Sequence, residues 1–283
     1  MKRVILVVIV FVVFLSGCAA DKNARDKKSV FVSILPMEYF VKAITGDKMD
    51  VEVMVLPGKS PATYEPTTSQ IVSLSEADVF FTIGVPFEAS FITKISNELK
   101  KLSIINTSKG ITKRHLGSHE SLDPHVWMSV INAKTISENI FNAITNIDRK
   151  NADEYTKKYE SLIKDLDDVD NELKELLVPY KGSKILVYHP AFGYLCDDYG
   201  LIQLSIEMGG KEPSPAHIEK IIKEAKENNI RFIFVQEEFP SQSAETIAKA
   251  INGSVIKINP LSHDYVNNIK IIAENIKKAA VDK

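Results

Sequence analysis

The chain has 283 residues and a formal net charge of −2 with its histidines neutral. Acidic and basic side chains therefore nearly balance, which gives no reason to expect nucleic acid or another polyanionic partner. The length allows one large domain or two small ones, and two cysteines are too few for a Cys-rich metal centre.

The first residues have the features of a bacterial export signal. Two basic residues precede an apolar run over residues 4–15, which is too short to span a bilayer. The run ends in Leu-Ser-Gly-Cys, which resembles the lipobox of bacterial lipoproteins and implies removal of residues 1–17 and diacylation of Cys18. The mature domain is then expected outside the cytoplasm, anchored by lipid to a bacterial membrane. An ordinary signal peptide with an incidental cysteine is the alternative.

The segment after the lipobox is polar. Residues 18–29 carry several charges and no apolar periodicity, which predicts a lipid-anchored, flexible tether. With Cys18 modified, Cys196 has no partner for an intramolecular disulfide, and we expect it to be a buried, unreactive thiol.

The rest of the chain alternates short β-rich runs with amphipathic segments, which predicts parallel sheets covered by helices. An N-terminal α/β lobe is expected over residues 30–150 and a C-terminal α/β lobe over residues 181–283. The strands expected in the first lobe are residues 30–35, 51–56, 79–83 and 102–105, and its helices include 37–44, 87–99 and 131–147. The strands expected in the second lobe are residues 185–188, 202–206, 232–235 and 255–258, followed by a closing helix over 265–280.

Between the lobes, residues 151–180 carry one apolar stripe with alternating spacings of four and three. Its members are Tyr155, Tyr159, Leu162, Leu166, Val169, Leu173 and Leu176. This pattern predicts a single linking helix along both lobes, with a coiled-coil dimer as the alternative. The predicted fold is therefore α/β, with two open parallel-sheet lobes joined by one long rigid helix, and the chain is expected to be a monomer.

Two histidines next to prolines stand out, one in each lobe: His125 in Asp-Pro-His and His189 in Tyr-His-Pro. Neutral imidazole is the commonest protein ligand for zinc and similar metals. His189 directly follows an expected strand, and open parallel sheets bind ligands beyond the carboxyl ends of their strands. Asp264 lies just past the last expected strand, so we expect it to face the same cleft.

Several segments, in this order, resemble those of the metal-binding lipoproteins, or solute-binding proteins, of zinc and manganese ABC importers. They are PGKSPATYEP at 57–66, DPHVW at 123–127, HPAFGY at 189–194, EPSPA at 212–216 and PLSHDY at 260–265. The resemblance implies two lobes bridged by a long helix, a metal between them, and delivery to a membrane permease powered by an ATPase. It implies no enzymatic activity.

Carried onto this chain, the resemblance implies His125 as the ligand from the first lobe, and His189 and Asp264 as the ligands from the second. Manganese-selective members of the family usually carry glutamate where this chain has His189. Because imidazole suits zinc and hard oxygen ligands suit manganese, Zn²⁺ is the expected cargo, with Mn²⁺ or Fe²⁺ as alternatives.

One departure from the family pattern is serious, because the histidine of its PH-x-YEP motif falls on Ala62. A water molecule could complete the site, as in catalytic zinc centres. A nearby donor could replace the histidine, with Glu65, His119 and His115 as candidates, or tight metal binding could be lost. Glu65 could also orient an imidazole.

Glu237, which follows the expected strand 232–235, is another candidate to orient an imidazole, and a plain surface carboxylate is the alternative. Two other functions stay open at this point. One is a metal-free or adhesin-like relative of the same fold. The other is a zinc-dependent hydrolase with Glu65 as its base, although the sequence has no nucleophile elbow, HExxH motif or phosphate loop.

Overall fold

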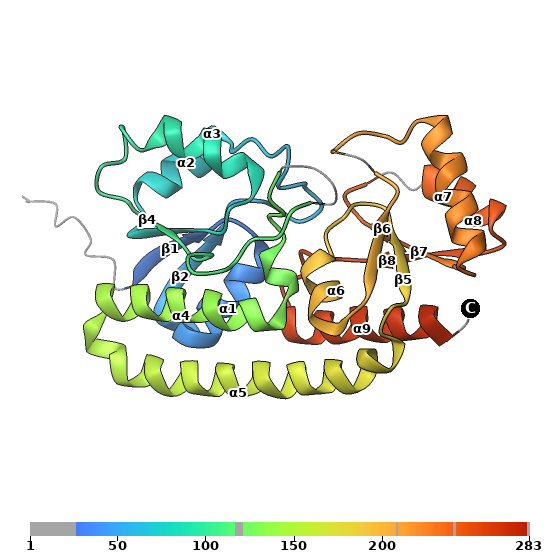
Figure 1. Ribbon diagram of the computed structural model, residues 1–283. Helices are drawn as coiled ribbons and strands as arrows, with labels where there is room; N and C mark the ends of the chain where they lie inside the picture. Colours follow the sequence, from blue (N-terminus) through green and yellow to red (C-terminus); the bar gives the residue numbers. More distant parts are fainter. Residues whose placement is uncertain (1–26, 117–120, 208, 240–241, 282–283) are drawn as a thin grey trace, which may run out of the picture.

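The computed structural model describes residues 27–116, 121–207, 209–239 and 242–281. The predictions for the export signal, for Cys18 and for His119 lie outside the described residues. Two α/β lobes lie side by side, and one long helix runs beneath both of them (Figure 1). Within the described residues, no helix is long and apolar enough to cross a membrane.

The first lobe is built on a four-stranded parallel sheet with the order β2-β1-β3-β4. Its strands are β1 (Lys28–Val32), β2 (Met49–Val53), β3 (Val79–Thr82) and β4 (Ser103–Asn106). Its helices are α1 (Leu35–Thr45), α2 (Thr68–Ser75), α3 (Pro86–Ile95) and α4 (Val130–Ile147). The central strand β3 is buried along its whole length, as expected for a parallel strand covered on both faces.

The second lobe repeats this arrangement with the order β6-β5-β7-β8. Its strands are β5 (Lys184–Val187), β6 (Ile202–Ser205), β7 (Phe232–Gln236) and β8 (Ser254–Ile258). Its helices are α6 (Gly193–Tyr199), α7 (Pro215–Glu227), α8 (Gln242–Ala250) and α9 (Tyr265–Val281). The chain leaves β5 toward one edge and returns to β7 on the other side, so a ligand crevice is expected where the strand order reverses.

The linking helix α5 (Ala152–Leu177) has 26 residues. It packs against α1 and α4 of the first lobe and α9 of the second. The predicted stripe is its inner face, although Tyr159 and Leu176 are only half-buried. Because the stripe is covered within the chain, it needs no second helix to explain it. The predicted fold class of two parallel-sheet lobes joined by one long helix is confirmed.

The first two strands end earlier than predicted. The expected strands over 30–35 and 51–56 stop at Val32 and Val53. Ile34 and Val55 are nevertheless buried, because the loops at the carboxyl ends of these strands fold back into the core. Pro36 in the first turn of α1 also favours an early start of that helix. Apolar character alone therefore marked buried loop residues as strand.

One apolar core extends through both lobes. It joins β1 and β3 of the first lobe, the inner face of α5, and α6 and α9 of the second lobe. A smaller core between α7, α8 and the sheet fills the outer part of the second lobe. The lobes are thus docked by buried apolar surface, and this docking places the carboxyl ends of both sheets at a shared cleft.

Candidate metal site

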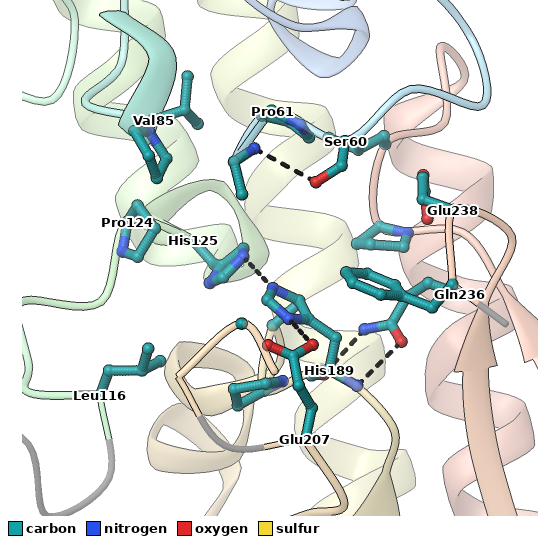
Figure 2. A pocket seen from close by; sticks show the side chains of 18 of the residues that line it. Ser60, Pro61, Val85, Leu116, Pro124, His125, His189, Glu207, Gln236 and Glu238 are labelled. Atoms are coloured by element: carbon teal, nitrogen blue, oxygen red, sulfur yellow. Dashed lines mark hydrogen bonds and ion pairs between the residues drawn. The ribbon is translucent and has the colours of Figure 1, made fainter. Parts of the chain in front are cut away.

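A pocket of about 380 Å³ lies between the lobes. The first lobe contributes residues 60–62, the loop after β3 and the segment around His125. The second lobe contributes the loops that follow all four of its strands, including His189 after β5 and Glu207 after β6 (Figure 2). The pocket therefore occupies the place where open parallel sheets bind ligands.

His125 is fixed by the buried carboxylate of Asp123. Asp123 Oδ1 accepts a hydrogen bond from the backbone nitrogen of His125 at 2.9 Å and lies 2.8 Å from its Nδ1. Arg114 Nη1 donates to the other oxygen, Oδ2, at 3.0 Å. Burial alone raises the pKa of Asp123, but the bonds from His125 and Arg114 outweigh it and hold this pKa below its ordinary value. Asp123 is therefore an ionised acceptor.

Burial has the opposite effect on the imidazole. Burial lowers the pKa of His125, and Asp123, which raises it, does not fully compensate. The neighbouring His189 lowers the pKa of His125 further. His125 is therefore a neutral imidazole at neutral pH, which is the form that binds a metal.

His189 is held by a matching carboxylate of its own lobe. Its Nδ1 lies 2.7 Å from Glu207 Oε2, and Glu207 is buried. The side-chain amide of Gln236 holds the backbone of His189 on both sides: Nε2 donates to its carbonyl at 2.8 Å, and Oε1 accepts from its nitrogen at 3.3 Å. The ring of Phe239 stacks on the imidazole, with 4.6 Å between ring centroids.

The two imidazoles meet across the cleft with their Nε2 atoms 3.2 Å apart. A carboxylate oxygen accepts hydrogen bonds, so each Nδ1 that faces one is placed to donate its hydrogen. Each Nε2 then presents a lone pair to the cleft, as in the carboxylate–histidine pairs of zinc proteins. Two nitrogens bound to one tetrahedral zinc at about 2.0–2.1 Å lie about 3.3–3.4 Å apart. The observed spacing thus fits two ligands of a single ion.

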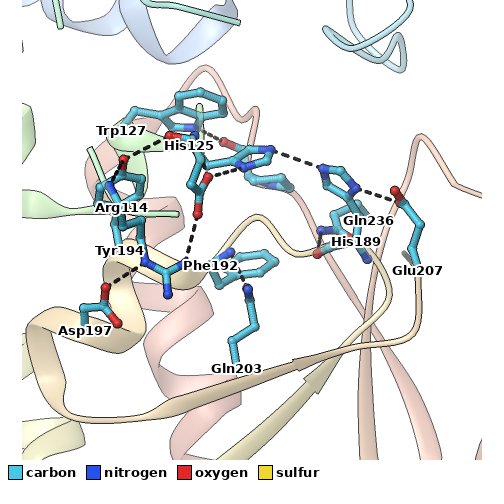
Figure 3. A network of polar contacts seen from close by, with 12 residues as sticks. Arg114, His125, Trp127, His189, Phe192, Tyr194, Asp197, Gln203, Glu207 and Gln236 are labelled. Atoms are coloured by element: carbon cyan, nitrogen blue, oxygen red, sulfur yellow. Dashed lines mark hydrogen bonds and ion pairs between the residues drawn. The ribbon is translucent and has the colours of Figure 1, made fainter. Parts of the chain in front are cut away.

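Bonds across the lobe boundary hold the His125 segment in place (Figure 3). Arg114 Nε donates to Asp197 of α6 at 2.7 Å, and the hydroxyl of Tyr194 donates to the carbonyl of Asp123 at 2.9 Å. Gly193 lies against the side chain of Arg114, because a Cβ there would come within 1.7 Å of Arg114 Nη1. The glycine therefore leaves the space that the guanidinium occupies.

A second pair of cross-lobe bonds involves Trp127. The indole nitrogen of Trp127 donates to the carbonyl of Pro260 at 2.8 Å, and the hydroxyl of Tyr265 donates to the carbonyl of Trp127 at 2.8 Å. All three groups are buried or nearly so. The second lobe thus holds the chain on both sides of His125.

The predicted site residues are only partly brought together. Ala62 lines the pocket with His125 and His189, and its methyl group offers no donor. Asp264 does not line the pocket: it is exposed, and its carboxylate accepts bonds from the backbone and side chain of Asn267 in the first turn of α9. This is a correction to the predicted cleft position of Asp264, because the start of a helix uses such a carboxylate as a cap.

The candidate substitute donors also lie elsewhere. Glu65 and His115 are exposed and do not line the pocket. Glu237 is exposed and borders a separate small cavity, whereas its neighbour Glu238 lines the pocket. Among the described residues, no group of three or more His, Cys, Asp or Glu side chains is arranged to hold a metal.

Sequence reasoning missed three groups that support the imidazoles. Glu207 directly follows the predicted strand 202–206, so the rule that selected His189 also applies to it. Asp123 belongs to the Asp-Pro-His motif, which marked the histidine but not the role of its neighbour. Arg114 carried no local signal, because its partner Asp197 is 83 residues away.

The sequence of this chain matches a known protein family over most of its length. Residues 30–279 match the family described as zinc-uptake complex component A, periplasmic. The chain belongs to this family. The predicted relationship to the solute-binding proteins of zinc importers is confirmed.

Two relatives and one solved structure resemble this chain over most of its length. The chain is 30% identical over 263 residues to the high-affinity zinc uptake system protein ZnuA of Bacillus subtilis (strain 168), covering 87% of this chain and 81% of that protein. It is 27% identical to the zinc-binding lipoprotein AdcA of Streptococcus pneumoniae (strain ATCC BAA-255 / R6); the match covers 98% of this chain but only 60% of AdcA. A crystal structure of ZnuA superimposes with a TM-score of 0.87 at 33% identity, covering 90% of this chain and 100% of the other.

Proposed function

We propose that this protein captures zinc outside the cytoplasm and delivers it to a membrane ABC permease powered by a cytoplasmic ATPase. The observation that carries the proposal is the imidazole pair, with its two Nε2 atoms 3.2 Å apart and a carboxylate at each Nδ1. Membership in a family of zinc-uptake components supports the permease and its ATPase as partners.

The ligands in this proposal are the Nε2 atoms of His125 and His189. Two nitrogen donors favour Zn²⁺ over Mn²⁺ or Fe²⁺, which prefer more oxygen in their ligand sets. Asp123 and Glu207 orient the rings and raise their basicity from behind. The remaining corners of a tetrahedron are open to a donor from outside the described residues.

The lipobox supports a lipid on Cys18 that keeps the protein at the membrane surface. The segment between Cys18 and β1 then gives the domain reach toward the permease; it is shorter than the predicted tether 18–29, because Lys28 and Ser29 belong to β1. The domain acts as a monomer. The other functions have less support. The base suggested for a zinc hydrolase, Glu65, does not line the pocket. The two facing imidazoles favour a metal-binding protein over a metal-free relative of the fold.

Calorimetric titration of the tag-free chain from residue 19 onward, with Zn²⁺ and Mn²⁺, tests the proposal. We expect one zinc per chain, bound more tightly than manganese, and no binding in the His125→Ala/His189→Ala double variant. His263→Ala is the matched control, because this exposed histidine contacts Glu38 and lies outside the pocket. Absence of zinc binding by the unaltered protein refutes the proposal.

A further inference from the structure

The pocket supplies fewer donors than a zinc ion needs. His125 and His189 provide two corners of a tetrahedron, and the carboxylates next to them are engaged at their Nδ1 atoms. Ala62, which also lines the pocket, offers no donor, and no third His, Cys, Asp or Glu side chain of the described residues joins the pair. The described side chains thus leave two coordination positions of a tetrahedral zinc open.

The pocket is also larger than a hydrated ion requires. Its volume is about 380 Å³, whereas one water molecule takes about 30 Å³ in the liquid. The two waters that would complete the coordination of a zinc ion take roughly 60 Å³, about one sixth of this space. Pockets for small organic ligands begin near 300 Å³. The volume matches a small organic molecule next to the ion.

The walls around the imidazoles are largely apolar. Val85, Leu116 and Leu122 line the side of the first lobe, and Phe239 stacks on the ring of His189. Water molecules bound to a metal find few hydrogen-bond partners on such walls, and a polar group buried without a partner costs free energy. A ligand that presents polar donors to the metal and carbon to the walls fits this surface better.

The charge of the pocket selects among such ligands. Two carboxylates, Glu207 and Glu238, line it, and none of its described lining residues is Lys or Arg. Glu207 already faces His189, which leaves Glu238, half-buried at the rim, to attract a cation. A chelate with a net positive charge is favoured, and an anionic complex such as zinc citrate is repelled.

Building on the proposed zinc-capture function, we propose that this pocket takes zinc together with one α-amino acid. The amino nitrogen and one carboxylate oxygen fill the two open corners, and the amino acid side chain lies against the apolar walls. The ammonium group releases one proton to solvent when its nitrogen binds. Zn²⁺ with one amino-acid anion carries a charge of +1, which suits the acidic rim. The chelator thus replaces the donor absent at Ala62.

The test measures which molecules the mature protein retains. The protein is dialysed against labelled L-histidine, labelled glycine or labelled citrate. Each ligand is used once without zinc and once with zinc, and all zinc-containing samples have the same free zinc concentration. Native mass spectrometry then counts the molecules that stay bound. We expect one amino acid per chain, retained only with zinc, and no citrate. Zinc bound without any amino acid overturns this proposal but leaves zinc capture intact. No zinc in any arm overturns both.

Position 62 provides the matched variants. Ala62→His adds an imidazole at the pocket and should bind zinc while retaining at least tenfold less amino acid, because one open corner is taken. Thr63→His is the control, since Thr63 is an exposed neighbour that does not line the pocket, and it should retain as much as the unaltered protein. Equal retention by Ala62→His and the unaltered protein contradicts the proposal.

Discussion

The two imidazoles of the site are alike in chemistry but differ in what holds them. His189 is fixed within its own lobe, by Glu207 after β6 and by Gln236 at the end of β7. His125 depends on Asp123, which is bonded to Arg114, and Arg114 is tied to Asp197 in the other lobe. The position of His125 is therefore a result of lobe docking, whereas the position of His189 is not.

This difference has a consequence for the spacing of the pair. The two Nε2 atoms lie 3.2 Å apart in the docked arrangement, in which Arg114 is bonded to Asp197 and Tyr194 of the second lobe. The shared apolar core and α5 favour the docked arrangement. Loss of the buried carboxylate of Asp123 should thus alter both zinc affinity and stability, and a change behind His189 should alter affinity alone.

Asp123→Ala should have the largest effect. The substitution removes the acceptor for His125 and leaves the guanidinium of Arg114 without its buried partner. We expect a loss of zinc affinity on the order of 10–100-fold. The free energy of unfolding of the metal-free protein should also fall by about 2–3 kcal/mol, because bonds to charged groups are lost. Zinc competition and urea denaturation measure the two effects.

The control for this variant is Asp197→Ala. Asp197 is the outer partner of Arg114, with its side chain 57% exposed. Its loss should lower stability by less than about 1 kcal/mol, as for other exposed ion pairs. If Asp123→Ala were no more destabilising than this control, the buried carboxylate of Asp123 would not support the site.

Glu207→Gln should affect binding with little change in stability. Glutamine keeps an acceptor for Nδ1 of His189 but removes the charge that raises the basicity of the ring. Zinc affinity should fall by about tenfold, and the free energy of unfolding should change by less than about 1 kcal/mol because the hydrogen bond remains. Calorimetry and urea denaturation of the same sample separate the two quantities. A loss of stability equal to that of Asp123→Ala would remove the contrast between the halves.

Asp198→Asn should leave zinc affinity unchanged, and its effect on stability should depend on pH. Asp198 on α6 lies at the lobe boundary near Ser129, and burial raises its pKa to about 6, above its ordinary value of 3.8. The folded state therefore binds more protons than the unfolded state between these values, so stability falls as pH rises through this window and stays lowered above it. The variant lacks this penalty.

We expect the Asp198→Asn protein to be about 1–2 kcal/mol more stable at pH 8, after allowance for solvent screening of a partly exposed group. Below about pH 3, where the aspartic acid is protonated in both states, the two proteins should unfold at the same urea concentration. Denaturation at pH 3 and pH 8 checks this. Zinc affinity at pH 8 should be unchanged, since Asp198 does not line the pocket; a tenfold change would mean that docking at α6 controls the site more widely.

Much of the site was predictable because its signals are local. Proline next to His125 and His189, and the place of His189 after a strand, selected both imidazoles from six histidines. The same rule of strand ends selected Asp264, which the structure places at the start of α9, bonded to Asn267. Position after a strand does not specify which way a side chain points, and a helix start competes for the same carboxylate.

The sequence by itself determined the alternation of strands and helices, the single stripe of α5, one imidazole in each lobe and the absence of a histidine at position 62. Each of these is written in neighbouring residues or in a short period along the chain. Only the tertiary structure decided that the two Nε2 atoms face each other, that Glu207 stands behind His189, and that Arg114 reaches Asp197. Those contacts join residues far apart in the chain. They result from the docking of two lobes through a shared apolar core, and such docking produces no periodic pattern in the sequence.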